Sequence, residues 1–86
     1  MPTGFIRVTP DFLIDGQTLI VTGVKDPSGR TVASRVRVAP PERAAEVAFE
    51  SYRAHHGEHP VREVLVSPAL VEARPATFPF AVAARN

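Results

Sequence analysis

The stretch that decides the fold runs from residue 30 to residue 57 and reads RTVASRVRVAPPERAAEVAFESYRAHHG. Its first part, residues 30–39, alternates between apolar and polar side chains, which is typical of a β-strand with two different faces. Two adjacent prolines then end the strand. From Pro41 to His56 most residues are good helix formers. The stretch therefore predicts a strand over 30–39 that is followed directly by a helix over 41–56.

Each face of the predicted strand carries its own set of side chains. One face has Val32, Ser34, Val36 and Val38, and the other has Thr31, Ala33, Arg35 and Arg37. We expect the valines to face the core and the two arginines to project from the open face of the sheet, on the layer opposite the helix. Arginines in that position could bind phosphate or the carboxylates of a partner. A solvated sheet face explains the same residues without a ligand.

The predicted helix is amphipathic. Pro41 suits the first helical position, and Gly57 is a natural stop after the last turn. The polar side of the helical wheel carries Glu42, Arg43, Glu46, Glu50 and Arg53, and the other side carries Ala44, Ala45, Ala48, Phe49 and Tyr52. The small residues allow close approach to a sheet, and we expect Phe49 to be the main anchor of the helix.

The remaining elements follow outward from this stretch. Residues 5–9 and 17–24 predict two strands, and the turn at 26–29 joins the second of them to 30–39 as an antiparallel hairpin. Residues 61–67 are apolar on both faces, which favours a central strand. Residues 68–75 form a connection with one helical turn possible at 69–72, and Phe78, Phe80 and Val82 predict a last strand at an edge. The order β-β-β-α-β-β predicts an α+β fold, with one helix packed on one face of a four- to five-stranded, mainly antiparallel sheet, in a single domain over 1–86.

The composition narrows the function classes. The chain has 86 residues, a formal net charge of +1 and no cysteine. The balanced charge argues against a nucleic-acid or membrane-surface binder, and the lack of cysteine excludes disulfides, thiol catalysis and cysteine-based zinc sites. Neither a signal peptide nor an apolar run long enough for a bilayer occurs, so we expect a cytoplasmic protein. No G-x-S-x-G or phosphate-loop motif is present either, and we expect neither enzymatic activity nor a cofactor.

Three histidines form a candidate metal cluster in the segment His55-His56-Gly57-Glu58-His59. Zinc needs three or four ligands that converge on the ion. His55 and His56 are adjacent on the helix and diverge by about 100°, and His59 lies beyond the glycine, from where it could approach only one of them. We therefore expect no metal here. Histidines at a helix C-terminus interact favourably with the helix dipole, which explains them without an ion.

Glu42, Glu46 and Glu50 recur every four residues and so form a row along the helix, which we call the acidic row. Its steps of about 6 Å are comparable to the spacing of every second phosphate along one DNA strand. Such a row, with Arg53 beside it, could occupy a basic nucleic-acid channel on another protein. A solvated helix face with weak ion pairs is the alternative.

The layout resembles that of small phage-encoded anti-CRISPR proteins that block type I surveillance complexes. The resemblance covers residues 17–86 and rests on the hairpin ending in Val32–Val38, the proline-initiated Ala/Glu helix, the strand Glu63–Ser67 and a proline-containing C-terminal strand. It implies a non-enzymatic inhibitor that sterically occupies a macromolecular surface in the host cytoplasm. The partner would be a protein, such as a nucleic-acid-binding complex, and the residues expected to bind it are Glu42, Glu46, Glu50, Arg53, Arg35 and Arg37.

Two other functions stay open at this point. The chain could be a small nucleic-acid-binding or regulatory module that uses Arg35 and Arg37, although the same strand face offers no aromatic side chain to stack on bases. It could also be an assembly subunit that pairs through exposed sheet edges, which leaves open whether it is a monomer or a homodimer.

Overall fold

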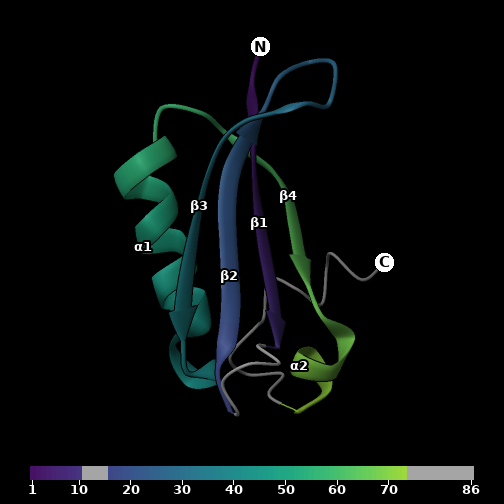
Figure 1. The fold of residues 1–86 in the computed structure, drawn as a ribbon, viewed down its shortest axis with the longest axis vertical. Coiled ribbons are helices and arrows are strands. Elements are labelled where there is room, and N and C mark those ends of the chain that lie inside the picture. The colour runs from purple at the N-terminus through teal and green to yellow at the C-terminus, as the bar shows by residue number, and fades with distance from the viewer. Residues whose placement is uncertain (11–15, 74–86) are drawn as a thin grey trace.

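The computed structural model describes residues 1–10 and 16–73. In chain order its elements are β1 (Thr3–Pro10), β2 (Thr18–Lys25), β3 (Thr31–Ala39), the 3-10 turn η1 (Pro41–Arg43), α1 (Ala44–His56), β4 (Val61–Val66) and α2 (Pro68–Ala73). The strands form one sheet in the order β3-β2-β1-β4 (Figure 1). The predicted α+β class, with one long helix on a mainly antiparallel sheet, is confirmed.

The sheet combines two kinds of pairing. β2 pairs antiparallel with both β1 and β3, whereas β4 pairs parallel to β1 after the chain has crossed over through α1. In the part of the chain that the structure describes, β4 has β1 as its one neighbour and so stands at the edge of the sheet, where we predicted a central strand. On the face of β4 that points away from α1, Leu65 is half exposed. The predicted last strand with Phe78, Phe80 and Val82 lies outside the described residues.

The turn between β2 and β3 has the predicted form. Gly29 has a φ of +91°, a conformation that glycine adopts without strain. The Asp26 carboxylate accepts hydrogen bonds from the backbone N–H groups of Ser28 and Arg30, both at 3.0 Å, and from the Ser28 hydroxyl. These bonds, the one from the Ser28 hydroxyl first, hold the pKa of Asp26 below its usual value. This local network closes the hairpin.

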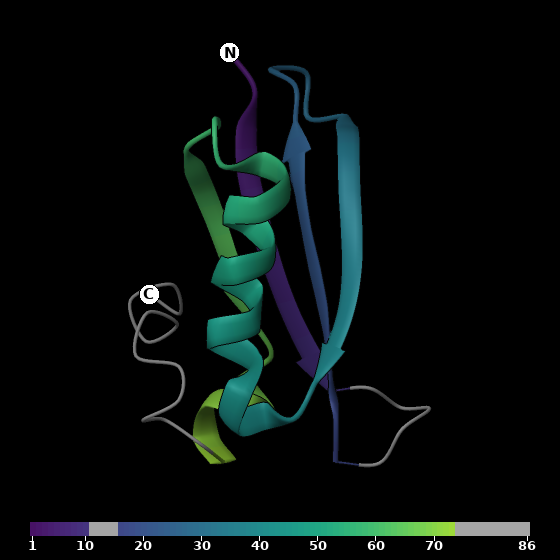
Figure 2. The same cartoon turned by 90° about the vertical axis from the view of Figure 1, so that its left-hand side faces the viewer.

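Helix α1 lies across one face of the sheet and runs roughly along the strands (Figure 2). Its small residues Ala44 and Ala48 are fully buried against that face, as the helical wheel predicted. Phe49, however, is only half-buried, whereas Tyr52 is buried and its hydroxyl donates a hydrogen bond to the His59 carbonyl at 2.6 Å. The main anchor of the helix is therefore Tyr52 and not Phe49.

The hydrophobic core lies between α1 and the middle of the sheet. Its buried members are Ile6, Val8, Ile20, Ala39, Ala44, Ala48, Tyr52 and Leu70. The strand residues in this set all point toward α1, and the residues next to them in each strand point to the other face. This is the pattern expected of a sheet that is covered on one side. Within residues 1–10 and 16–73, no helix is both long and apolar enough to span a bilayer.

The two faces of β3 point the opposite way to our prediction. Arg37 pairs with Ile20 and Arg35 with Thr22, both of which are buried beneath α1, so the two arginines lie on the helix side of the sheet. The valines of β3 lie on the open face, with Val36 60% exposed. Edge strand β3 tolerates this arrangement because its helix-facing side stays accessible to solvent along most of its length.

Candidate functional site

The open face of the sheet is apolar over the β2–β3 half. On this face Val36 pairs with Val21, and Val38 pairs with Leu19. On the far strand Leu65 occupies the same row as Val21, with Arg7 of β1 between them. We call this surface the valine face and define it by Leu19, Val21, Val36, Val38 and Leu65.

Charged residues of both signs lie on the same side of the sheet: Arg7 stands between Val21 and Leu65, and Lys25 and Glu63 lie toward one end of the valine face. There the Phe5 ring lies over Gly23, and the cationic groups of Arg7 and Lys25 stand 5.3 and 5.2 Å from the ring centroid. The Glu63 carboxylate accepts a hydrogen bond from Lys25 at 3.4 Å and comes within 4.0 Å of Arg7. The alternation of residues in β1 and β2 is consistent with an apolar open face. The sequence analysis did not predict the valine face, because it placed the valines of β3 in the core.

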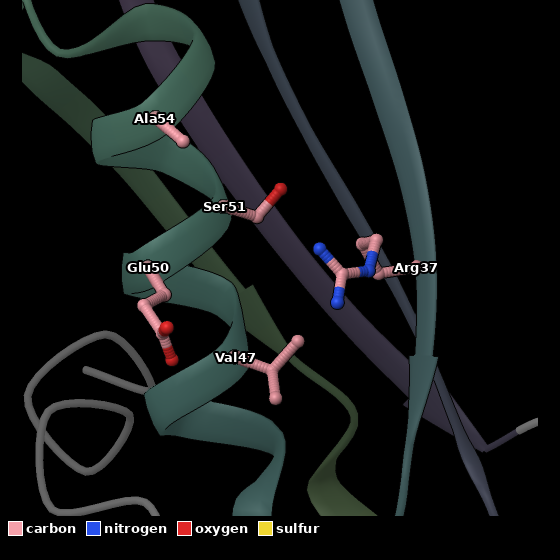
Figure 3. Close-up of a pocket in the computed structure, with 5 residues that line it drawn as sticks. All are labelled: Arg37, Val47, Glu50, Ser51 and Ala54. Atoms are coloured by element: carbon pink, nitrogen blue, oxygen red, sulfur yellow. The ribbon is translucent and has the colours of Figure 1, made fainter.

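A second surface lies on the helix side, where α1 and β3 stand apart. A cavity of about 130 Å³ there is lined by Arg37 of β3 and by Val47, Glu50, Ser51 and Ala54 of α1. Figure 3 shows the Arg37 guanidinium reaching toward the helix and the Ser51 hydroxyl pointing from the helix toward β3. We call this region, with Arg35 and Thr22 next to Arg37 in the sheet, the arginine cleft.

Three buried polar atoms lie on the helix side of the sheet, and of their residues Ser51 lines the cavity while Thr22 and His56 are near Arg35. They are Thr22 Oγ1, Ser51 Oγ and His56 Nε2, and none of them has a hydrogen-bond partner among the described residues. Ser51 is 2% exposed and His56 is 6% exposed. A buried polar group without a partner costs about 1–3 kcal/mol, and three such atoms in one region of a small domain are unusual. The arginine cleft is thus polar and carries charges of both signs, Arg37 and Glu50, whereas the β2–β3 half of the valine face on the other side of the sheet is apolar.

The three histidines do not converge. The His56 ring packs 5.6 Å from the Tyr52 ring, and the His55 ring is 6.2 Å from that of His56. Burial lowers the pKa of His56, and the nearby His55, Arg35 and His59 lower it further, so this side chain favours the neutral form. Among residues 1–10 and 16–73, no group of three or more His, Cys, Asp or Glu side chains is placed to hold a metal ion.

The acidic row lies in solvent, as the helical wheel predicted. Glu42, Glu46 and Glu50 are all exposed, and so is Arg53. Glu46 is 3.5 Å from Arg43, an exposed pair of the kind that contributes little to stability. Glu50 lines the same cavity as Arg37. The two charged surfaces that we placed on opposite layers therefore meet on one side of the molecule.

Comparison with known proteins adds no further constraint: no family model, curated protein or solved structure matches this chain.

Proposed function

We propose that this chain is a non-enzymatic protein-binding domain, that its binding surface is the valine face, and that the occupant of this surface is a second copy of the chain. The observation that carries the proposal is the exposure of three large apolar residues on one sheet face. Val36 is 60% exposed, Leu65 48% and Val38 43%.

An apolar open face is unusual for a small antiparallel sheet. Such sheets commonly bury one face on the core and place polar residues on the solvent face. Here Leu19 and Val21 of the central strand β2 also lie on the open face and are only partly buried. Contiguous exposed apolar surface on a soluble protein marks an interaction site. The neighbouring residues of β2 and β3 form the contiguous part of the valine face, and Arg7 separates Leu65 from it. Docking would remove this surface from water, which stabilises a complex by about 25 cal/mol per Å² of apolar area.

The features of the sheet favour face-to-face packing of two copies. Pairing through the edge of β3 is less favourable, because a strand added there would desolvate Arg35 and Arg37, and inward-pointing charges on an edge strand disfavour such pairing. Two sheets can instead stack face to face at about 10 Å with their side chains interdigitating. The open face of the sheet carries both charge signs, so in a two-fold arrangement Glu63 of one copy can approach the cations of the other.

The proposal is tested by measuring mass against concentration. We expect sedimentation equilibrium to show a reversible dimer, of twice the 9.3 kDa chain, at high protein concentration. Val36→Glu should weaken dimerisation by roughly a hundredfold or more, because the interface would bury an unpaired carboxylate. Each monomer should keep its fold, since Val36 is exposed.

Arg30→Gln is the matched control. It lowers the net charge by the same single unit as Val36→Glu, but the side chain of Arg30 is exposed in the turn before β3. Its dimerisation should equal that of the unaltered chain. A monomeric mass at every concentration up to the millimolar range would overturn the proposal, and so would equal weakening by the two variants.

The narrower hypothesis of an anti-CRISPR inhibitor depends on a different surface, the acidic row. The exposure of Glu42, Glu46 and Glu50 is the observation in its favour. If the row docks in a basic channel, changing all three residues to Lys should abolish binding to a purified type I surveillance complex, because like charges would then face each other. Each change should alter stability by no more than about 0.5 kcal/mol. Glu58→Lys, in the exposed turn after α1, is the control, and full binding by the triple variant would exclude the helix face.

A further inference from the structure

We propose that the arginine cleft is a binding site for a small phosphate-type anion, held by Arg35 and Arg37 of β3 and by Ser51 of α1. The site is independent of the valine face, which lies on the other side of the sheet, so each proposal can fail without affecting the other.

The first observation is that, among the described residues, the two arginines of the cleft make no ion pair. Arg35 and Arg37 both face the helix side, about 7 Å apart along β3. The ion pairs among residues 1–10 and 16–73 join Arg7 and Lys25 to Glu63, and Arg43 to Glu46, so neither cleft arginine has a carboxylate within 4.0 Å. Glu50 lines the cavity but makes no ion pair with Arg37. A guanidinium is a planar fork of donors whose geometry matches two oxygens of a phosphate.

The second observation is a buried donor aimed into the same space. Ser51 lines the cavity, and its hydroxyl is buried and has no hydrogen-bond partner in the described part of the chain. Figure 3 shows it on the side of α1 that faces Arg37. A hydroxyl can donate to a phosphate oxygen, which would satisfy the group. If the two arginines were simply part of a solvated sheet face, that explanation would not account for the buried, unpartnered hydroxyl beside them.

The size of the cavity limits the ligand. At about 130 Å³ it holds roughly four water volumes, and it is well below the ~300 Å³ at which pockets for drug-sized ligands begin. One phosphate group therefore fits, and the rest of any larger molecule would remain outside. The phosphate group could come from free inorganic phosphate or from the phosphoryl end of a small phosphomonoester. The apolar side chain of Val47 forms one wall of the cavity and offers no hydrogen bond to a bulkier polar ligand.

The test is an NMR titration of the full chain at constant pH and ionic strength. Inorganic phosphate should give saturable shifts at the Ser51 amide and at the side-chain Nε–H of Arg37, whereas sodium chloride should not. Phosphoserine as the second probe distinguishes the sources. Tighter binding than that of phosphate points to a phosphomonoester, and weaker binding points to the free anion, and both support the site. No saturable shift with either probe overturns it.

Single substitutions separate a built site from a general positive field. Arg37→Gln should weaken phosphate binding by about tenfold or more, since one charge-assisted hydrogen-bonding fork is lost. Arg37→Lys should recover only part of the affinity, because the charge remains but the fork does not. Ser51→Ala should weaken binding several-fold without any change of charge.

Arg53→Gln is the matched control, because it removes one exposed positive charge from α1 outside the cavity. It should leave the affinity unchanged. If Arg53→Gln and Arg37→Gln weaken binding equally, the proposal fails, and the cleft arginines serve only to keep a further strand from adding to the edge of β3.

Discussion

Tyr52→Ala is expected to lower the free energy of unfolding by about 3–5 kcal/mol, the range for removing a large aromatic side chain from a core. Tyr52 is 4% exposed and belongs to the core cluster between α1 and the sheet. Its ring lies directly against Gly4 of β1, where a side chain on residue 4 would collide with it. The substitution would therefore leave a cavity at the point where the helix meets the sheet. Chemical denaturation monitored by circular dichroism measures the loss.

Two further variants test the cause of this loss. Tyr52→Phe keeps the ring and removes only the hydrogen bond to the His59 carbonyl, so it should cost about 0.5–1.5 kcal/mol. Phe49→Ala should cost less than Tyr52→Ala, because Phe49 is only half-buried. A larger loss for Phe49→Ala would show that the helix is rotated relative to the structure and would restore the anchor that the sequence predicted.

Gly23→Ala is expected to have the second-largest effect, near the upper end of the roughly 1–3 kcal/mol typical of overpacking. A methyl group at residue 23 would stand 2.5 Å from the Ala33 carbonyl oxygen and 2.7 Å from two atoms of the Phe5 ring. The oxygen belongs to the backbone of β3, so the clash can be relieved only by moving a strand. Because ordinary domains are stable by only 5–15 kcal/mol, the melt should shift clearly.

A second substitution tests whether the Phe5 ring contributes to this clash. Phe5→Leu replaces the ring with a smaller side chain, and in the Gly23→Ala background it should recover part of the loss, so the two changes should be non-additive. The comparison uses the single Phe5→Leu variant as its reference. Unchanged stability of Gly23→Ala, or strict additivity of the pair, would contradict the close packing of β1, β2 and β3 at this point.

Local patterns in the sequence were sufficient for most of the fold. The turn at 26–29, the hairpin it closes and the amphipathic helix after Pro41 each depend on residues close together in the chain. The sides of α1 could also be assigned from the sequence, since Ala44 and Ala48 are buried while the acidic row is exposed. A helix that covers a sheet must bury its less polar side, so its orientation follows from its own residues.

The orientation of β3 could not be assigned in this way. Its alternation separates the valines from Arg35 and Arg37, but a period of two is the same whichever face is turned to the helix. The pairing with β2 decides the matter, because Ile20 and Thr22 lie under α1 and place Arg37 and Arg35 beside them. Burial of the β2 residues outweighs the preference of the valines, since an edge strand can leave both of its faces partly in water.

Both candidate surfaces depend on that pairing. The valines of β3 lie beside Leu19 and Val21 of β2 on the valine face. The alternation within each strand shows which of its residues share a face, but it does not show that these two sets lie on the same side of the sheet. The arginine cleft likewise combines Arg37 with Ser51 from a different element, and no local pattern relates a strand arginine to a helix serine. The sequence by itself determined which elements form and which residues share a face within each of them. Only the tertiary structure decided which faces meet, because that depends on hydrogen-bond register and burial between segments distant in the chain.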